Sequence, residues 1–510
     1  MDRTRTKNVI VLLFDSLNRH MLGSYGGEEF ATPNFDAFAD HALTFNRHFT
    51  GSLPCMPARH DILVGAMDFL WRPWGSIEIW EDAITYAMRR KGITTMLVAD
   101  HPHLFETGGE NYHTDFKAWD YLRGHESDPW KTRPDPSWQG APHFYPRDMP
   151  YDNSRGYFGG EEDFPGPRTM RATVDWLREH APHHENFFLF VDEFDPHEPF
   201  DTPDKWSKMY DDDWDKDPLI WPPYAVGAVE KGVITEREGR QIRAQYGAKL
   251  SMIDHWFGKV MQTLEDTGRL DDTLIILTTD HGHYLGEKDI WGKPGTPVQK
   301  TLGHIPLHIS GPGIAPGETD ALTTSVDIFA TLADLYDLDV RQRTHGRSLL
   351  PILSNTSQDV RDYVLTGVWG REVQVTDGRH LFARAPAGKN APLAMYSNRW
   401  STMPIHANGP DGREMHTRDI FPLPDDRAEL HKVPGSDVPV IRQPFQPGDM
   451  LPYWAGRKFT GDHLYDLAAP VGEEPDRADS SDARTYLDLL RHALDDVEAP
   501  EEQYERLGVS

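Results

Sequence analysis

The stretch Gly51–His60 contains the residues whose types and spacing most directly suggest chemistry. Cys55 is the only cysteine in 510 residues, so it has no partner for an internal disulfide and serves either packing or reactivity. Pro54 and Pro57 stiffen the backbone around it. Arg59 follows four positions later, where a permanent cation can hold an anion beside the sulfur. Composition alone favours a buried structural cysteine in a proline-rich turn, so the interpretation depends on the rest of the chain.

A second group of reactive side chains follows two apolar runs that are typical of buried strands. Asp15 comes directly after Val9–Phe14. Asp280 and His281 come shortly after Thr273–Leu277. An Asp-His pair can simply cap a turn. Two carboxylates and an imidazole can also bind a divalent ion, and carboxylates brought close together repel unless a cation or a proton lies between them.

Four more side chains can act on an anionic substrate or on its leaving group. Lys293 closes a Trp-Gly-Lys sequence, and His197 lies between two prolines in an acidic loop. His101 and His103 follow the expected strand Thr94–Val98. Each of these histidines has an ordinary alternative as a loop residue, because nothing in its local spacing requires chemistry.

The pattern of apolar residues alternates between strands and helices. This alternation predicts an α/β fold with a large, mostly parallel sheet sandwiched between helices. The carboxyl ends of parallel strands meet at one edge of the sheet, which brings Asp15 together with Asp280 and His281. The expected strands are Val9–Phe14, Thr94–Val98, Phe187–Val191, Thr273–Leu277 and Ile305–Ile309, and the expected helices are Thr32–Ala42, Ile84–Arg90, Thr169–Glu179, Tyr246–Leu264 and Val326–Leu338.

The pattern changes after about residue 360, where shorter alternating strands begin. We therefore predict two domains, a catalytic α/β domain at 1–360 and a smaller C-terminal α+β domain at 361–510. Residues 125–165 lack periodicity, and we interpret them as a surface insertion that can shape a pocket. Residues 201–224 are acidic and proline-rich, which indicates a solvated loop. The expected C-terminal elements are strands near Asp362–Trp369, Arg371–Thr376 and Arg379–Ala383 and a helix near Asp482–Val497.

Composition restricts the class of protein. The chain exceeds the usual size of one domain, and a hydrophobic content of 38% argues against global disorder. A formal net charge of −29 argues against a nucleic-acid-binding protein, so an anionic substrate needs a local basic pocket. Because no apolar run is long enough to cross a membrane and no secretory cleavage site follows the first run, we expect a cytoplasmic protein without membrane association. The oligomeric state stays open, with a homo-oligomer allowed.

The motifs, in their order along the chain, resemble the type I, formylglycine-dependent sulfatases of the alkaline phosphatase-like superfamily. The resemblance covers most of the chain. It implies that a formylglycine-generating enzyme oxidises Cys55 to formylglycine, and that Asp15, Asp280, His281 and residue 55 bind one divalent metal. The motifs are Asp15 after the first strand, Thr32-Pro-Asn34, Cys55-x-Pro57-x-Arg59, Asp195-Pro-His-Glu-Pro199, Asp280-His-Gly282, Trp291-Gly-Lys293, Gly311-Pro-Gly313, His345-Gly-Arg347 and Leu464-Tyr-Asp-Leu467.

Three positions depart from the pattern that is common in this family. Ser16 stands where many members have a second acid, and His281 stands where asparagine is common. This variant resembles the choline-sulfatase and phosphonate-monoester-hydrolase branches. An imidazole ligand shifts the preference from calcium toward manganese, so the metal is either Ca²⁺ or Mn²⁺. After the second strand the family often places a Gly-Lys-Trp-His sequence, and a shift of one residue puts His101 and His103 at its Lys and His positions.

The resemblance implies a sulfuric ester hydrolase that acts on a small-molecule or saccharide sulfate ester. A hydroxyl of the hydrated aldehyde attacks sulfur, the metal, Arg59 and Lys293 neutralise the sulfate oxygens, and His197 or Lys293 protonates the leaving alcohol. We therefore expect Arg59 and Lys293 to act on the substrate or the nucleophile rather than on stability. The main alternative is a phosphonate monoester or phosphodiester hydrolase with the same site. An inactive anion-binding relative is the alternative outside the enzymes.

Overall fold

The computed structural model describes residues 1–133, 150–401, 407–408, 414–415, 424–449, 451–455 and 461–509. Its central feature is an eight-stranded sheet with the order β12-β2-β11-β8-β1-β6-β4-β5. All of its neighbouring strands are parallel except β11, which is antiparallel to β8 and β2, so the expected mostly parallel sheet is confirmed. The strands are β1 Asn8–Phe14, β2 Leu43–Phe49, β4 Thr94–Ala99, β5 Ala118–Tyr121, β6 Phe187–Glu193, β8 Thr273–Thr278, β11 Leu307–Ser310 and β12 Gly317–Thr324.

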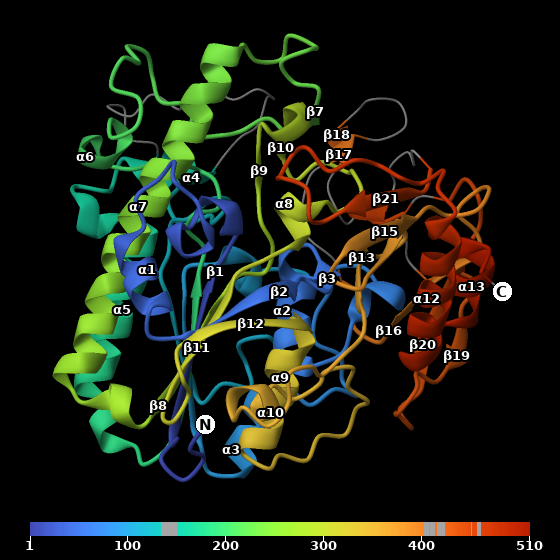
Figure 1. The fold of residues 1–510 in the computed structure, drawn as a ribbon, viewed down its shortest axis with the longest axis horizontal. Coiled ribbons are helices and arrows are strands. Elements are labelled where there is room, and N and C mark those ends of the chain that lie inside the picture. The colour runs from blue at the N-terminus through green and yellow to red at the C-terminus, as the bar shows by residue number, and fades with distance from the viewer. Residues whose placement is uncertain are drawn as a thin grey trace.

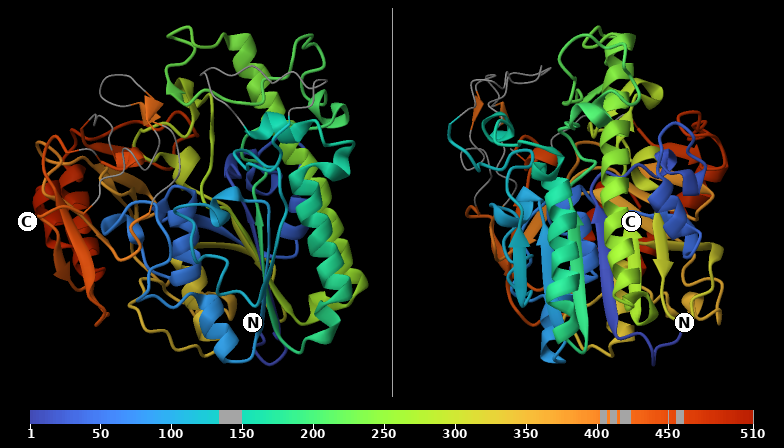
Figure 2. Two further views of the ribbon diagram at one scale, coloured as in Figure 1. Left: turned by 180° about the vertical axis from the view of Figure 1, so that it is seen from behind. Right: turned by 90° about the vertical axis from the view of Figure 1, so that its left-hand side faces the viewer.

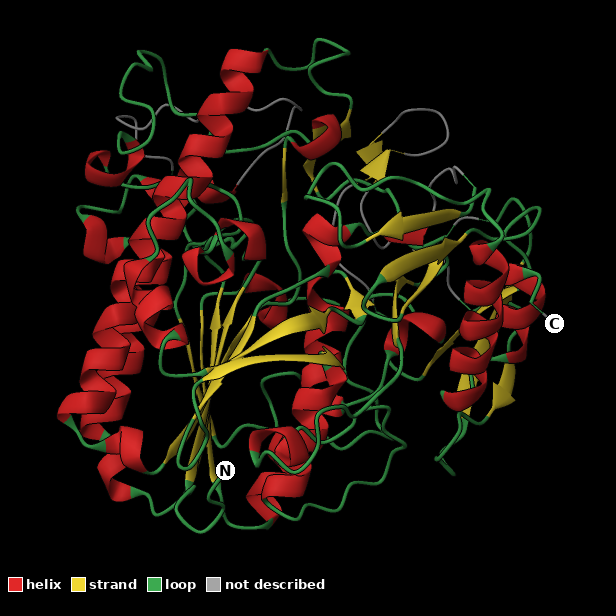
Figure 3. Cartoon of the chain, viewed as in Figure 1, coloured by secondary structure: helices red, strands yellow, loops and turns green. Residues whose placement is uncertain are grey.

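Helices cover both faces of this sheet, as Figures 1 and 3 show. Successive side chains of β1 point to opposite faces, so Ile10 and Leu12 join one buried cluster while Val9 and Val11 join the other. One layer contains α1 Pro33–Ala39, α5 Pro165–Glu179 and α7 Glu236–Asp266; the other contains α2 Cys55–Val64, α3 Ile84–Arg90, α9 Val326–Leu335 and α10 Leu350–Leu353. The two-layer burial explains why β1, β6 and β8 each contain a continuous apolar run.

A second, smaller sheet lies beside the first, and its strands from the C-terminal part of the chain are coloured orange to red in Figures 1 and 2. Its order is β21-β15-β14-β13-β3, and α12 Asp482–Asp496 and α13 Glu501–Leu507 accompany it. Strand β3 comes from the N-terminal part of the chain, directly before Cys55, and pairs in parallel with β13. The smaller sheet therefore supports the segment that carries the cysteine. Its strands are β3 Ser52–Leu53, β13 Val364–Val368, β14 Val373–Thr376, β15 His380–Arg384 and β21 His463–Asp466.

The remaining elements are short. They are β7 Ala225–Val226, β9 Tyr284–Leu285 and β10 Ile290–Gly292 in one small sheet, β16 Leu393–Ser397, β19 Glu429–His431 and β20 Val440–Phe445 in another, the pair β17 Ala407–Asn408 and β18 Glu414–Met415, and helices α4 Pro150–Arg155, α6 Asp204–Ser207 and α8 Lys300–Gly303. The fold class predicted from the sequence is confirmed, including the smaller C-terminal sheet. The boundary near residue 360 stays a prediction.

Three strands of the large sheet, β2, β5 and β12, were not predicted. The helix expected to run from Thr32 to Ala42 ends at Ala39, and β2 follows it. Strand β2 mixes polar and apolar residues, and its assignment depends on pairing with β11 and β12, which the local pattern does not reveal. Helix α7 begins earlier than expected, because Thr235 and Glu238 form a capping box at its start.

The two irregular segments differ from their predicted descriptions. Residues 134–149 of the expected insertion at 125–165 lie outside the described residues, and the part after them contains α4. The 201–224 segment is not uniformly solvated, because Ile220 and Trp221 are buried against Tyr151 and Phe158. Apolar side chains within an acidic loop therefore form a small core of their own.

No helix in the described part of the chain is long and apolar enough to cross a membrane. The cytoplasmic location stays a prediction.

Candidate active site

The segment around Cys55 is the first turn of a helix, and the predicted proline-rich turn is therefore wrong. Cys55 is the first residue of α2 and Pro54 precedes it. Pro57 fits the first turn, where a backbone N–H needs no partner within the helix. Arg59 lies one turn further on the same face, and its Nη1 donates to the carbonyl oxygen of Cys55 at 3.1 Å. The positive end of the helix thus lies at the sulfur, whose thiol pKa is raised by burial.

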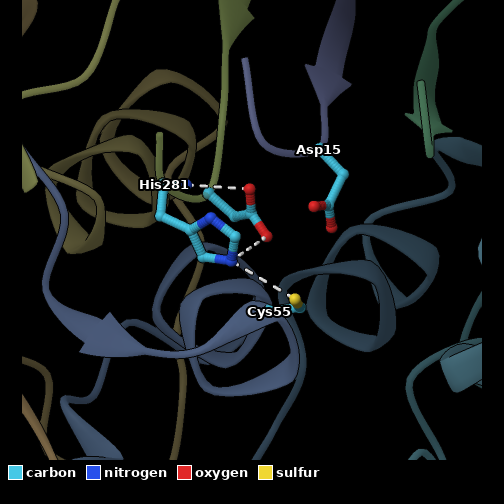
Figure 4. A group of neighbouring side chains, drawn as sticks. Asp15, Cys55 and His281 are labelled. Carbon is cyan, nitrogen blue, oxygen red and sulfur yellow. Dashed lines mark hydrogen bonds and ion pairs between the residues drawn. The ribbon is translucent and has the colours of Figure 1, made fainter. Parts of the chain in front are cut away.

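Four side chains from three elements meet at the carboxyl edge of the large sheet. Asp15 follows β1, Asp280 and His281 follow the neighbouring β8, and Cys55 begins α2. One potential ligand atom of each lies within 4.8 Å of the others. The Nε2 of His281 is 3.2 Å from the sulfur of Cys55 and 3.3 Å from Oδ2 of Asp280. Figure 4 shows Asp15, Cys55 and His281 pointing toward one another.

The electrostatics of this group fit a bound cation. The Oδ2 atom of Asp15 is buried without a hydrogen-bond partner in the described structure. Burial and the nearby Asp280 raise the pKa of Asp15 well above its usual range. Burial lowers the pKa of His281 to about 4, which keeps the imidazole in the neutral form that binds metals. The carboxylates of Asp15 and Asp280 share one guanidinium, that of Arg59, with Asp192, so a divalent ion would supply further positive charge to this group.

Arg59 is completely buried among three carboxylates. Its Nε and Nη2 donate to Asp192 at 2.8 and 2.6 Å, and its Nη1 donates to Asp280 at 2.8 Å. Its Nη2 also lies 3.0 Å from Oδ2 of Asp15. The guanidinium therefore orients the carboxylates and the carbonyl oxygen of Cys55, and it leaves no unused edge for the substrate oxyanion that the sequence analysis assigned to it.

Asp192 is a site residue that sequence reasoning missed. It follows the apolar run Phe187–Val191, and β6 is the parallel neighbour of β1. The signal was present, because the first acid after a central strand is the same feature that identified Asp15. Burial raises the pKa of Asp192, and the ion pair with Arg59 opposes this effect.

We expect Arg59→Leu to destabilise the fold strongly. It would leave three buried carboxylates without their cation, a loss of about 3–5 kcal/mol in the free energy of unfolding. Denaturant unfolding of the variant measures this loss. Arg347→Leu is the control, because its side chain is 56% exposed and its ion pair with Asp496 contributes little. Equal stability of the two variants would refute the counter-ion role of Arg59.

Ser16 connects Lys293 to the candidate metal-binding group, which consists of Asp15, Cys55, Asp280 and His281. Its φ of +61° is in the left-handed region, and its hydroxyl donates to Oδ1 of Asp15 at 2.8 Å. Its backbone N–H donates to Asp280 at 3.1 Å. Lys293 Nζ donates to the Ser16 hydroxyl at 3.3 Å. Although burial lowers the pKa of Lys293, Cys55 and other acidic groups outweigh it and raise that pKa, so the lysine stays charged.

The three predicted histidines lie at the ends of β4 and β6. The ring of Phe194 stacks on His101 with a centroid distance of 4.4 Å and on His197 at 4.2 Å. Neither ring nitrogen of His101 has a hydrogen-bond partner among the described residues, although both are buried. Burial lowers the pKa of His101 and of His197, so both rings are neutral. His103 differs, because Glu106 and Glu126 outweigh burial and raise its pKa.

Glu198 is a second buried acid that the sequence analysis did not assign. Its carboxylate accepts a hydrogen bond from Tyr224, and its Oε2 lies 3.2 Å from Nε2 of His283. Burial opposes ionisation of Glu198, but His197 and Lys293 lower its pKa. The backbone oxygen of Glu198 lies 2.8 Å from Nδ1 of His197. Glu198 therefore fixes the orientation of His197.

A second group with metal-ligand spacing is closed by an arginine. His60 lies 3.0 Å from Glu81 and 3.3 Å from Asp68. The buried Arg72 pairs with the same two carboxylates at 3.4 and 2.7 Å, and also with Glu78 at 2.9 Å. Because a permanent cation already neutralises these acids, we interpret the group as a structural ion network. It holds α2 in place through His60, which belongs to that helix.

We expect the protein to bind one divalent ion per chain rather than two. Elemental analysis after dialysis should give a stoichiometry near one, because the two groups differ in their histidines. Although burial lowers the pKa of His60, Asp68 and Glu81 outweigh it and favour the protonated ring, whereas the ring of His281 is neutral and can bind a metal. Glu81→Gln should keep that ion. A second equivalent that disappears in the Glu81 variant would contradict this interpretation.

Comparison with known proteins gives the family. The family model described as Sulfatase matches residues 7–338, which is more than half of the chain. The chain belongs to the sulfatase family. This sulfatase is 28% identical to the choline-sulfatase of Rhizobium meliloti over 409 residues, which cover 74% of this chain and 78% of the relative. It is 24% identical to an arylsulfatase of Clostridium perfringens over 408 residues, which cover 70% and 80% of the two chains.

A solved structure shares the fold of this sulfatase. The phosphonate monoester hydrolase of Agrobacterium radiobacter superposes with a TM-score of 0.65 at 19% identity, and the match covers 98% of this chain and 96% of that one. The family and its relatives show that the chain is a hydrolase of the sulfatase type, and they support hydrolysis of sulfate esters in general.

Proposed function

We propose that this sulfatase cleaves a sulfate monoester to an alcohol and inorganic sulfate, with Cys55 converted to formylglycine as the nucleophile. The observation that carries the proposal is the position of Cys55. Its side chain lies at the positive end of α2, within a buried group of Asp15, Asp280 and His281. The hydrated aldehyde of formylglycine supplies the attacking oxygen.

Asp15, Asp280, His281 and residue 55 would hold one Ca²⁺ or Mn²⁺, which acts as a Lewis acid toward the sulfate oxygens. Side chains of the protein would neutralise and orient the sulfate. Lys293 is charged and is 6% exposed, so it can neutralise a sulfate oxygen in a pocket that largely excludes water. The unpartnered ring nitrogens of His101 offer a further hydrogen bond to the sulfate.

His197 is suited to protonate the leaving alcohol. Its Nδ1 is directed at the backbone oxygen of Glu198, which leaves Nε2 for the substrate. The ring is neutral in the free protein because of burial. A bound sulfate adds negative charge nearby and favours the protonated ring, so the proton is available when the ester is in place. Lys293 is the alternative proton donor. His103 forms ion pairs with Glu106 and Glu126, which fix the position of its ring.

A substrate screen tests the proposed function. The protein is produced with and without a formylglycine-generating enzyme, and its metal content is measured. Mass spectrometry of the peptide that contains Cys55 then shows whether the cysteine has been converted. Sulfated sugars, sulfated small alcohols and aryl sulfates are then assayed by release of inorganic sulfate. We expect release only from the modified, metal-loaded protein. Modified protein that releases sulfate from no substrate would refute the proposal, and absence of modification in a competent host would favour the inactive anion-binding relative.

The second candidate is hydrolysis of a phosphonate monoester or phosphodiester at the same site. The observation that favours it is His281, which contributes an imidazole to the metal-type group. The protein is also 26% identical over 427 residues to the multifunctional alkaline phosphatase superfamily protein PehA of Trinickia caryophylli. Rates on an aryl sulfate and an aryl phosphonate monoester, measured side by side, separate the two candidates.

We expect Lys293→Ala to lower kcat/KM by roughly 10²–10³-fold, because it removes a charged donor from a buried anion site. Stability should change little, since the side chain makes one hydrogen bond, to Ser16. Lys288→Ala is the control, because this lysine lies in the same segment and pairs with Glu474. An unfolded Lys293 variant with normal turnover per folded molecule would show that the lysine has a structural role instead.

A further inference from the structure

The charge of the candidate site includes an acid, Asp192, that is not among the candidate metal ligands. Around residue 55, the cations Arg59 and Lys293 face Asp15, Asp192 and Asp280. Glu198 also faces Lys293, so these four carboxylates would balance the two side-chain cations and a divalent ion held by this group. Asp15 and Asp280 share the role of ligands, whereas Asp192 bonds Arg59 through both of its oxygens, and its Oδ1 also lies 3.7 Å from Nδ1 of His101.

The geometry of that ion pair keeps the charge of Arg59 from the substrate. Asp192 takes the edge of the guanidinium formed by Nε and Nη2, at 2.8 and 2.6 Å, and both side chains are at most 1% exposed. The two hydrogen bonds therefore fix the relative orientation of Arg59 and Asp192, and the pair is shielded from solvent. Removing the carboxylate charge without changing the shape would raise the net charge of the pocket by one while Asp280 still holds Nη1.

We propose that Asp192 is a specificity-determining residue that matches the pocket to singly charged esters. The inference rests on the proposed function and concerns the charge of its substrate. Sulfate monoesters and phosphonate monoesters carry one negative charge, and phosphate monoesters carry close to two above a pH of about 7. An extra positive charge attracts the doubly charged ester about twice as strongly, so Asp192 lowers the relative binding of phosphate monoesters.

The test is Asp192→Asn in the modified, metal-loaded protein at a pH of about 8, where the aryl phosphate is doubly charged. We expect the ratio of kcat/KM for an aryl phosphate to that for the matching aryl sulfate to rise at least about tenfold. An aryl phosphonate monoester contains phosphorus but has one charge, so it should follow the sulfate. If the phosphonate rate rose together with the phosphate rate, the variant would favour phosphorus esters over sulfur esters whatever their charge. That result would overturn the proposal.

A binding measurement separates this proposal from the proposed function. Metal-loaded Cys55→Ala protein is titrated calorimetrically with methyl sulfate and with methyl phosphate, which have similar shapes and different charges. Adding Asp192→Asn should favour methyl phosphate over methyl sulfate by about tenfold, even if the protein turned out to hydrolyse neither ester. An unchanged affinity ratio would overturn the role of Asp192 whatever the activity.

Two further variants keep the test decisive. Asp192→Ser removes the same charge with a smaller side chain, and it replaces the Asn variant if that protein does not fold. Asp100→Asn is the control, because Asp100 is equally buried, lies at the end of the neighbouring β4 and bonds the N–H of Phe194 rather than Arg59. We expect the Asp100 variant to leave both ratios unchanged, and an equal shift in it would contradict the specific role of Asp192.

Discussion

Cys55→Ala should lower sulfate release by at least ~10³-fold and leave the protein folded. The variant removes the proposed nucleophile, which lies within the group of candidate metal ligands. The loss of packing is small, since alanine deletes one sulfur atom from a large buried cluster, at a cost of about 1 kcal/mol. Sulfate release and the midpoint of thermal unfolding measure the two effects.

Met56→Leu is the control for the Cys55 variant. Met56 is the next residue of α2, it is completely buried, and leucine nearly conserves its volume. This variant should retain most of the turnover. Cys55→Ser should be nearly as inactive as the alanine variant, because the proposed maturation step oxidises a cysteine. Substantial activity of Cys55→Ala would rule out the formylglycine mechanism.

Chelation of the metal should abolish turnover, and Asp15→Asn should do the same by at least ~10³-fold. Asp15 has a buried oxygen without a hydrogen-bond partner, and this atom is the natural ligand of a cation. Replacing it with an amide removes one of the two negative charges that attract the ion. Elemental analysis and activity after addition of Mn²⁺ or Ca²⁺ measure the two consequences separately.

His281→Asn tests the identity of the metal. It replaces an imidazole with an oxygen ligand, so it should shift the preference of the reactivated protein toward Ca²⁺. Glu81→Gln is the matched control, because it alters a buried acid of the second ion network and should leave metal content and turnover intact. Active wild-type protein without stoichiometric metal, or full activity of Asp15→Asn, would show that this metal site does not exist.

The sequence by itself determined the central sheet and the residues that meet at its edge. Strands β1, β6 and β8 each contain a continuous apolar run because both of their faces are buried, and such runs are recognisable without a structure. Parallel strands end at the same edge, so Asp15 and the pair at residues 280 and 281 had to converge. The sequence also places Arg59 near Cys55, but it does not show that both lie on one face of a helix, because the prolines around Cys55 favour a turn.

The tertiary structure alone decided what Arg59 does. The sequence shows an arginine four residues after a cysteine, but it does not show that β6 places Asp192 against the guanidinium, because that contact joins residues 133 positions apart. Strands β2 and β12 escaped prediction for the same reason, since their stability comes from pairing with distant strands rather than from local pattern. Local chemistry can therefore be read along the chain, whereas the charge of a buried site depends on which distant side chains the fold brings into contact.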